Sequence, residues 1–253
     1  MIPIERHQHI LALLEQQGTA SITELTDILG VSHMTIRRDV GKLEQEGLLV
    51  AVSGGVRSVN RLAIEPSHLV KSTLHSNEKS AIGRLAAENI PAHSCIYLDA
   101  GTTTLALAKE ILPRDDLQIV TNDFEITQLL INSSRCGVIH TGGTLCRENR
   151  SSTGESAART ILHLAIDIAF ISTSSWDLRG IFTPDESKIP VKRAVSQVSA
   201  KKVLLSDSSK FNQAATFMAL PLSAFDMVIS DSHLPETACT HMIQQGITKV
   251  LRG

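Results

Sequence analysis

The first part of the chain has apolar positions at helical spacing, separated by capping residues. Over residues 5–17 the apolar side chains recur every three or four positions, and Gly18 follows where a left-handed residue would end a helix. Ser21, with Glu24 three residues later, has the pattern of a capping box and predicts a second, short helix. Gly30 ends that pattern, so we expect two helices here, of which the second is short.

The next pattern predicts a third helix followed by a β-hairpin. Ile36, Val40 and Leu43 are spaced four and three residues apart, so they share the buried face of a helix. Residues 48–59 are rich in β-branched side chains, and a Gly-Gly dipeptide among them permits the positive φ angles of a hairpin turn. Three helices followed by a hairpin describe a winged helix-turn-helix domain, which we place at residues 1–60.

The rest of the chain alternates apolar runs with amphipathic segments. The apolar runs are residues 95–99, 117–121, 136–141, 167–172, 202–207, 227–230 and 248–252. The amphipathic segments between the first runs are residues 77–88, 103–111 and 124–131. Buried strands that alternate with helices imply parallel βαβ units, so we predict an open, mostly parallel α/β domain over residues 76–253. Residues 61–75 have no clean period and are expected to form a linker.

Composition and charge narrow the classes of function. The 253 residues carry 24 Lys and Arg against 26 Asp and Glu, and this formal charge of −2 excludes nucleic-acid binding by bulk positive charge. Aromatic residues make up only 3%, which argues against a stacking platform for single strands. No apolar run is long enough to span a bilayer, and four single cysteines fit a reducing compartment. We expect a cytoplasmic protein with no membrane contact, metal site or cofactor.

The outward face of the third predicted helix is a candidate DNA-contacting surface. It carries Arg, Lys and Gln side chains, which bind guanine, phosphate or adenine in the major groove. A pair of arginines on a helix also fits a solvated face that binds nothing, so the surrounding helix-turn-helix pattern is what favours DNA. The candidate DNA-contacting residues are Ser32, His33, Met34, Thr35, Arg37, Arg38, Lys42, Gln45 and Arg57.

Small polar turns follow three of the predicted strands and form a candidate anion site. The first turn opens a helix, where backbone N–H groups and threonine hydroxyls supply donors for a phosphate. The carboxyl ends of the strands in an open α/β sheet meet at the edge where ligands bind. Gly and Thr in such turns also serve helix capping alone, which is the alternative. The candidate residues are Asp99, Gly101, Thr102, Thr103, Thr104, Thr121, Asn122, Gly142 and Gly143.

Two sets of residues resemble the DeoR family of bacterial transcriptional regulators. Arg6, Ile10 and Leu14, with SHMTIRRDV at residues 32–40, match the helix-turn-helix signature of that family. The segments that match its sensor domain are DAGTTT (99–104), TN (121–122), GG (142–143), FISTSSWD (170–177), VKRAV (191–195) and SDSSKF (206–211). The family pattern also implies a structural role for Asp39, because a carboxylate on this helix would repel DNA phosphate.

The same resemblance implies a sensor domain similar in fold to ribose-5-phosphate isomerase. It implies a phosphorylated sugar or sugar acid as effector, with residues 101–104 on the phosphate and Lys192 and Lys210 as cationic partners. Trp176 lies where relatives commonly have GxSG, so we expect it to reshape the pocket. The implied function is a repressor of a carbohydrate or sugar-acid catabolic operon. Such a protein binds double-stranded operator DNA as a homo-oligomer, either a dimer or a tetramer.

Two other functions stay open at this point. An aldose–ketose phosphate isomerase needs a carboxylate that moves a proton and a donor for the enediolate oxygen. Asp99, Asp177 and Glu186 with Lys188 are the nearby candidates, but the paired acids typical of that isomerase are missing. An RNA-binding or scaffold protein is the other alternative, and steep salt dependence of duplex binding would distinguish a DNA regulator from it. Because fold similarity alone does not carry function, we expect a regulator and not an enzyme.

Overall fold

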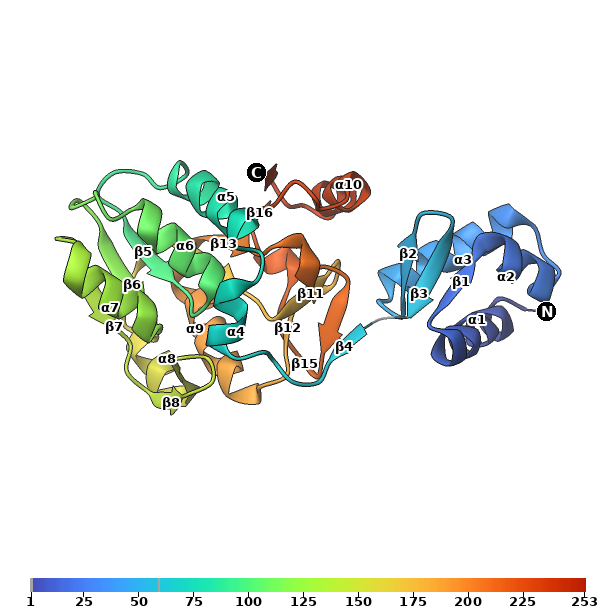
Figure 1. Ribbon diagram of the computed structural model, residues 1–253, viewed down its shortest axis with the longest axis horizontal. Helices are drawn as coiled ribbons and strands as arrows, with labels where there is room; N and C mark the ends of the chain where they lie inside the picture. The colour runs from blue at the N-terminus through green and yellow to red at the C-terminus, as the bar shows by residue number, and fades with distance from the viewer. Residues whose placement is uncertain (1, 59) are drawn as a thin grey trace.

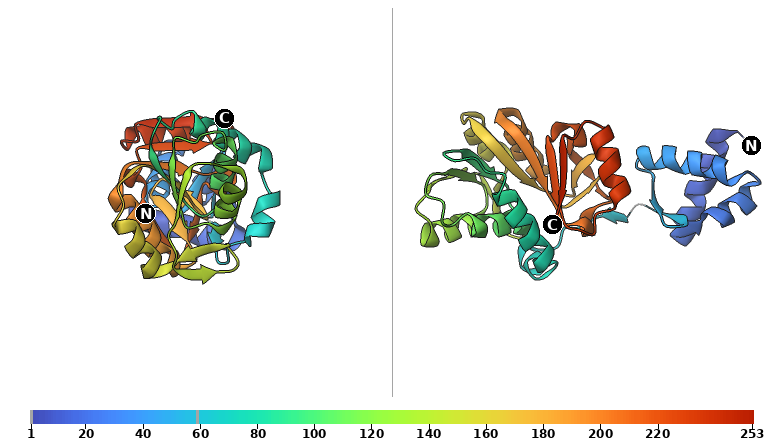
Figure 2. Two further views of the ribbon diagram at one scale, coloured as in Figure 1. Left: turned by 90° about the vertical axis from the view of Figure 1, so that its left-hand side faces the viewer. Right: turned by 90° about the horizontal axis from the view of Figure 1, so that it is seen from above.

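The computed structural model describes residues 2–58 and 60–253, which form two domains (Figure 1). Met1 and Val59, the last residue of the expected hairpin, lie outside the described residues. Figure 2 shows the N-terminal domain at one end of the long axis and the larger C-terminal domain at the other. Both parts of the predicted fold class, a winged helix-turn-helix and a mostly parallel α/β domain, are confirmed.

The N-terminal domain combines helices with a small antiparallel sheet. Its elements are α1 (Pro3–Gln17), β1 (Thr19–Ser21), α2 (Ile22–Leu29), α3 (His33–Gln45), β2 (Leu49–Val52) and β3 (Gly55–Ser58), with strand order β1-β3-β2. The Ser21 hydroxyl accepts a hydrogen bond from the Glu24 N–H at 3.0 Å, and the Glu24 carboxylate accepts one from the Ser21 N–H, so the predicted capping box is present. Gly30 ends α2 in the left-handed conformation. Strand β1 was not predicted, because three residues are too short to show a period.

The core of the N-terminal domain fixes which side of α3 faces solvent. Ile36, Val40 and Leu43 are buried together with Ile10 and Leu25 of the preceding helices. Each fully buried aliphatic side chain of this size contributes about 1.5–3 kcal/mol relative to exposure. The predicted apolar stripe of α3 is therefore confirmed, and its polar side is left to solvent.

A seven-stranded sheet forms the centre of the C-terminal domain. Its strands are β5 (Cys95–Leu98), β6 (Gln118–Thr121), β7 (Gly137–His140), β10 (Ile166–Ser172), β13 (Ser199–Leu205), β16 (Met227–Ser230) and β17 (Lys249–Arg252). Their order is β17-β16-β13-β10-β5-β6-β7, and every neighbouring pair is parallel. The chain builds the sheet outward in both directions from the β5–β10 pair. All seven apolar runs of the sequence coincide with these strands.

Helices cover both faces of this sheet. The first group, α5 (Ser76–Ala87), α6 (Thr102–Glu110) and α7 (Phe124–Ser133), packs into one apolar core. The second group, α8 (Gly154–Leu162), α9 (Ile189–Val198) and α10 (Glu236–Gln244), packs into the core on the other face. The first group corresponds to the amphipathic segments of the sequence, whereas the second group was not predicted.

Short elements that the sequence pattern did not reveal complete the domain. They are β4 (Asn60–Leu62), α4 (His68–Thr73), β8 (Thr144–Cys146), β9 (Ser151–Thr153), β11 (Ser175–Asp177), β12 (Gly180–Thr183), β14 (Gln213–Ala215), β15 (Phe217–Pro221) and the 3₁₀ turns η1 (Glu186–Lys188), η2 (Ser208–Lys210) and η3 (Leu222–Ala224). Strand β4 pairs in parallel with β14, so much of the expected linker, residues 61–75, is built into the C-terminal domain. Within the described residues, no helix combines the length and the apolar character that a membrane span requires.

Candidate functional site

Helix α3 presents a polar and basic face to solvent. Ser32 caps the helix, because its hydroxyl accepts a hydrogen bond from the N–H of the half-buried Thr35 at 3.3 Å. Met34 is 70% exposed, so a large apolar side chain stands in water beside the cations. We call the exposed side chains of α3 the reading face: His33, Met34, Arg37, Arg38, Lys42 and Gln45. The structure thus brings six of the predicted DNA-contacting residues together on one surface.

Asp39 points into the N-terminal domain and away from the reading face. Arg6 donates to its two carboxylate oxygens at 2.7 and 3.1 Å, and His7 Nε2 lies 3.1 Å from one of them. Burial by itself raises the pKa of Asp39, but the hydrogen bonds from Arg6 and His7 outweigh burial and keep that pKa below its ordinary value. The contact joins α1 to α3 and so orients the reading face, in agreement with the structural role implied for Asp39.

Arg57 does not join the reading face. It lies on β3, where alternate side chains point to opposite faces of the sheet. Its neighbour Val56 packs into the core beneath the helices, so Arg57 points to the other face. There it lines a cavity together with Leu178 and His233 of the C-terminal domain.

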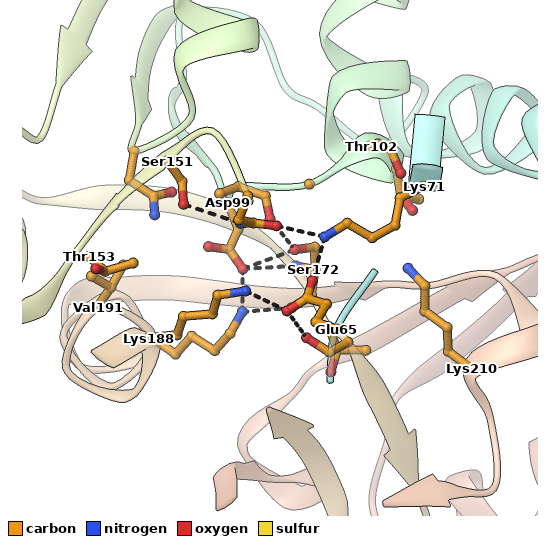
Figure 3. A pocket seen from close by; sticks show the side chains of 18 residues that line it. Glu65, Lys71, Asp99, Thr102, Ser151, Thr153, Ser172, Lys188, Val191 and Lys210 are labelled. Atoms are coloured by element: carbon orange, nitrogen blue, oxygen red, sulfur yellow. Dashed lines mark hydrogen bonds and ion pairs between the residues drawn. The ribbon is translucent and has the colours of Figure 1, made fainter. Parts of the chain in front are cut away.

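A pocket of about 500 Å³, open mouth included, lies at the carboxyl ends of β5, β6 and β10 (Figure 3). The strand order changes direction between β5 and β10, which is where open α/β sheets bind their ligands. The predicted effector residues that line the pocket are Asp99, Gly101, Thr102, Thr103, Asn122, Lys192 and Lys210.

Two buried threonine hydroxyls at the start of α6 line this pocket. Thr102 is 8% exposed and Thr103 is 1% exposed, and neither hydroxyl has a hydrogen-bond partner among the described residues. Leaving a buried polar group unpaired costs about 1–3 kcal/mol. The helix N-terminus adds unpaired N–H groups and the positive end of the helix dipole. This combination favours an oxyanion as ligand.

Gly101 and Asp123 shape the turn that precedes α6. A Cβ on Gly101 would lie 2.8 Å from Ser172 Oγ, so a larger residue would force the Ser172 side chain to shift. The Gly101 N–H donates to Asp123 Oδ2 at 3.0 Å, and the other oxygen of Asp123 caps α7 by accepting from the Ile126 N–H at 2.9 Å. Burial raises the pKa of Asp123 to about 7, against the lowering effect of these two hydrogen bonds.

Asp99 and Lys192 form a buried ion pair in the pocket. Lys192 Nζ donates to Asp99 Oδ2 at 2.5 Å and to the Ser172 carbonyl oxygen at 2.8 Å. The Ser172 N–H also donates to Asp99 Oδ2 at 3.1 Å. The pair joins α9 to β5 and β10, so Lys192 both lines the pocket and fixes its walls.

Two predicted effector residues use their hydroxyls for structure instead of lining the pocket. Thr104 donates to the carbonyl oxygens of Asp99 and Gly101 at 2.6 and 2.8 Å, within the same turn. Thr121 donates to the Leu98 carbonyl oxygen at 2.7 Å and so ties the ends of β5 and β6 together. Neither side chain therefore lines the pocket.

Three further predicted residues lie outside the pocket. Gly142 and Gly143 have φ angles of 64° and 120° and form the turn that follows β7. Trp176 is fully buried in the core under the second group of helices, with its ring 4.8 Å from that of Phe211. The expectation that Trp176 reshapes the pocket is therefore corrected, because packing on β11 turns the indole into the apolar core.

The structure also brings into the pocket residues outside the predicted effector set, among them Lys188, which the sequence offered only as a candidate for isomerase chemistry. The Glu65 carboxylate accepts hydrogen bonds from Lys71, from Lys188 at 2.5 Å and from the Ser174 hydroxyl at 2.7 Å (Figure 3). Lys71 also donates to Asn149 Oδ1 at 2.6 Å. Glu65 and Lys71 lie in the segment without a period, which also contains Arg61 and two histidines, so no local signal in the sequence points to them.

Comparison with known proteins connects both surfaces to one family. The family model for the DeoR-like helix-turn-helix domain matches residues 6–61, and that for the DeoR C terminal sensor domain matches residues 74–232. The chain is 54% identical over 248 residues to the uncharacterised HTH-type transcriptional regulator YgbI of Escherichia coli (strain K12), with 98% of this chain and 97% of that one covered. It is 32% identical over 232 residues to the glycerol-3-phosphate regulon repressor of the same organism, with 91% and 92% covered.

A solved structure gives a weaker likeness. Ribose 5-phosphate isomerase A from Methanocaldococcus jannaschii matches with a TM-score of 0.39 and 15% sequence identity, over 54% of each chain.

Proposed function

The chain belongs to the DeoR family of transcriptional regulators, and on this basis we propose that it represses a carbohydrate or sugar-acid catabolic operon in response to a bound metabolite. The metabolite is a phosphorylated sugar or sugar acid that binds in the pocket and changes the affinity of the protein for operator DNA. The observation that carries this proposal is a pair of buried hydroxyls, those of Thr102 and Thr103, which find no partner among the described residues and lie in a pocket lined by lysines.

The charge of the pocket supports an anionic effector. The ionisable side chains that line it are the carboxylates of Glu65 and Asp99 and the amines of Lys71, Lys188, Lys192 and Lys210. Lys210 is also paired with Asp207 at 3.4 Å, outside the lining, and four cations against three anions still leave a positive excess that attracts a phosphate. Hydrogen bonds to a charged partner contribute about 1.5–3 kcal/mol each, so the two threonine hydroxyls add substantially to this attraction.

Neutral polar groups in the same pocket support the sugar part of the effector. Asn122, Asn149, Ser151 and Thr153 line the pocket beside the charged groups. Amide and hydroxyl groups both donate and accept hydrogen bonds, which suits the hydroxyls of a sugar chain. A phosphorylated sugar or sugar acid therefore fits both the charge and the polarity of the pocket.

The reading face supports binding of double-stranded DNA. Arg37, Arg38 and Lys42 concentrate positive charge on one exposed surface of a chain whose formal charge is −2. Arginine binds guanine edges through two parallel hydrogen bonds, and lysine binds backbone phosphate. A homodimer would place two such helices about 34 Å apart, one turn of DNA, and would recognise a palindromic or repeated operator.

Proton-transfer catalysis has less support from the same residues. Both pocket carboxylates are engaged in ion pairs, Asp99 with Lys192 and Glu65 with two lysines. Asp177, a further candidate for isomerase chemistry, is held by Arg179 at 2.7 Å and does not line the pocket. The relatives are transcriptional regulators, so binding and not turnover is the role that the pocket supports best.

Fluorescence anisotropy tests the proposal directly. Labelled duplexes from upstream of this protein's own gene and its neighbours are titrated at several salt concentrations, with ribose 5-phosphate, glucose 6-phosphate, glycerol 3-phosphate, 6-phosphogluconate or inorganic phosphate present. We expect tight binding that weakens steeply with salt and that one phosphorylated compound changes about tenfold or more, or about 1.4 kcal/mol. Failure to bind any of the duplexes would contradict the proposed regulator, and binding that no compound changes would contradict the proposed effector site.

A further inference from the structure

Glu65 belongs to the segment that joins the two domains, yet its carboxylate lies in the pocket (Figure 3). Its side chain is 14% exposed. One oxygen accepts a hydrogen bond from Lys71 of α4, and the other accepts from Lys188 at 2.5 Å and from Ser174 at 2.7 Å. Both carboxylate oxygens are therefore bound by residues that line the pocket.

The cluster around Glu65 has the composition of an oxyanion site. Lys71 and Lys188 place two ammonium groups and Ser174 one hydroxyl on a single carboxylate, and both lysine side chains are only 12% exposed. Burial by itself raises the pKa of Glu65, but the charges of Lys188 and Lys71 outweigh it and keep the pKa well below its ordinary value. The site is thus built for a fixed negative charge, and the protein's own carboxylate supplies that charge.

The position of Glu65 along the chain links this cluster to the N-terminal domain. Glu65 lies three residues beyond β4, and β4 begins two residues after the last residue of β3. The pairing of β4 with β14 and the Glu65 contacts together hold this joining segment, residues 60–67, against the C-terminal domain. Displacement of the Glu65 carboxylate would break the Glu65 contacts and leave only the β4–β14 pairing to hold the joining segment.

We propose that Lys71, Lys188 and Ser174 form an anion subsite of the effector pocket, and that an oxyanion group of the effector replaces Glu65 there. The inference rests on the proposed function, since it takes the pocket as the effector site. Replacement frees the joining segment from the pocket and lowers the affinity of the N-terminal domain for operator DNA. The effector that fits carries a phosphate for the threonines of α6 and a second oxyanion for this subsite.

Glu65→Gln is the test variant, and Glu148→Gln is its matched control. The Glu65→Gln change keeps the size of the native side chain but removes its charge and one of its two acceptor oxygens, because the amide NH2 group only donates. Glu148 precedes a pocket residue, is exposed, and makes no side-chain hydrogen bond or ion pair within residues 2–58 and 60–253. Calorimetric titration with inorganic phosphate and with sodium acetate compares wild type and both variants. We expect Glu65→Gln to bind phosphate, acetate or both about tenfold more tightly, and the control to match wild type.

Comparing the two anions shows which kind of oxyanion, a carboxylate or a phosphoryl group, the subsite binds. Preference of Glu65→Gln for acetate identifies a carboxylate, and preference for phosphate identifies a phosphoryl group. Equal affinities in wild type and Glu65→Gln would overturn the inference and leave the proposed function standing. Absence of phosphate binding by all three proteins would overturn the proposed pocket as well.

Hydrogen exchange and operator binding test the coupling. We expect faster amide exchange over residues 60–67 in Glu65→Gln, and in wild type once phosphate saturates it, with unchanged exchange in α5 to α7 as evidence of an intact fold. We also expect ligand-free Glu65→Gln to bind operator about fivefold or more weakly than wild type. If Glu65→Gln showed the same amide exchange and the same operator affinity as wild type, the proposed coupling between the pocket and operator binding would be overturned.

Discussion

The reading face and the pocket are built in opposite ways. The reading face comes from one continuous helix, α3, and the period of that helix determines which side chains share the face. The pocket draws its side chains from segments spread between Glu65 and Lys210, which only the fold of the C-terminal domain brings together. A surface of the first kind is specified locally, whereas a surface of the second kind depends on the position of many elements at once.

The two surfaces also differ in how their charges are held. Arg37 and Arg38 are exposed and make no ion pair within the described residues, so DNA phosphate meets unpaired cations. In the pocket, Lys192 is paired with Asp99 and Lys188 with Glu65. An incoming anion must therefore join or replace carboxylates already present. This difference suits the first surface to salt-sensitive binding and the second to a ligand-dependent change.

Breaking the Lys192–Asp99 pair should cause the largest loss of unfolding free energy. The loss should be confined to the C-terminal domain, which contains both residues. Lys192→Met leaves Asp99, whose side chain is 4% exposed, without its buried partner. Removing one member of a buried pair costs about 3–5 kcal/mol of unfolding free energy. Trp176, the single tryptophan of the chain, lies in the C-terminal core, so its fluorescence in urea reports this domain. Lys109→Met, at an exposed position on α6, is the control, and a loss as small as the control's would contradict this prediction.

Thr103→Val should weaken anion binding without weakening the fold. The hydroxyl has no hydrogen-bond partner among the described residues, so the free protein loses nothing when a methyl group replaces it. The bound anion loses a charged hydrogen bond, and we expect phosphate affinity to fall by about 1.5–3 kcal/mol, or about 10- to 150-fold. Calorimetry checks the affinity and urea unfolding checks the stability. Thr160→Val on α8, outside the pocket, should bind phosphate like wild type, and equal affinity in both variants would remove Thr103 from the site.

Arg38→Ala should reduce operator affinity and leave the pocket unaffected. If Arg38 contacts a base edge, its loss costs about 1–3 kcal/mol and relaxes sequence preference at one position. Arg84→Ala makes the same change at an exposed site on α5 of the C-terminal domain and should leave operator binding as it is. Anisotropy with the operator and with single-base variants checks both. An Arg38→Ala protein with wild-type affinity and preference would exclude this role.

The pH dependence of the unfolding free energy should show that Asp123, whose carboxylate binds the Gly101 N–H beside the anion site, titrates near neutral pH. Burial raises the pKa of Asp123 from 3.8 to about 7 in the folded protein, so the folded state binds its proton more tightly than the unfolded state does. The resulting stabilisation is complete below about pH 4 and is lost as pH rises toward 7. Asp123→Asn keeps an N-cap side chain but removes the titration.

Urea unfolding at pH 5 and pH 8 measures this effect. Wild type should lose stability relative to Asp123→Asn between the two values. Asp115→Asn, at an exposed position, controls for the change of charge. Parallel pH profiles for wild type and Asp123→Asn would show that Asp123 does not titrate in this range.

The sequence predicted what is periodic and local. The stripe of Ile36, Val40 and Leu43 oriented α3, and the apolar runs located all seven strands of the large sheet. The turn after β5 was recognisable because Gly and Thr stand together between a strand and a helix. Thr102 and Thr103 accordingly lie where the pattern placed them.

The features of the pocket that the sequence did not predict depend on contacts between distant segments of the chain. No local pattern shows that Glu65 meets Lys188, because more than a hundred residues separate them and the sheet sets their approach. Thr104 and Trp176 belong to the same motifs as residues of the pocket, but helix geometry and core packing turn them away from it. A motif therefore located the turn, and only the fold decided which of its side chains face the ligand.

The central claim is that occupancy of the pocket controls operator affinity. The direct test is an anisotropy titration of operator DNA with wild type and with the Thr102→Val/Thr103→Val double variant, each with and without the phosphorylated compound to which wild type responds. Without that compound, the two proteins should bind operator equally. With it, the dissociation constant of wild type should shift about fivefold or more, and that of the double variant should stay unchanged. An equal shift in both proteins would contradict the account, because control would then come from a site other than this pocket.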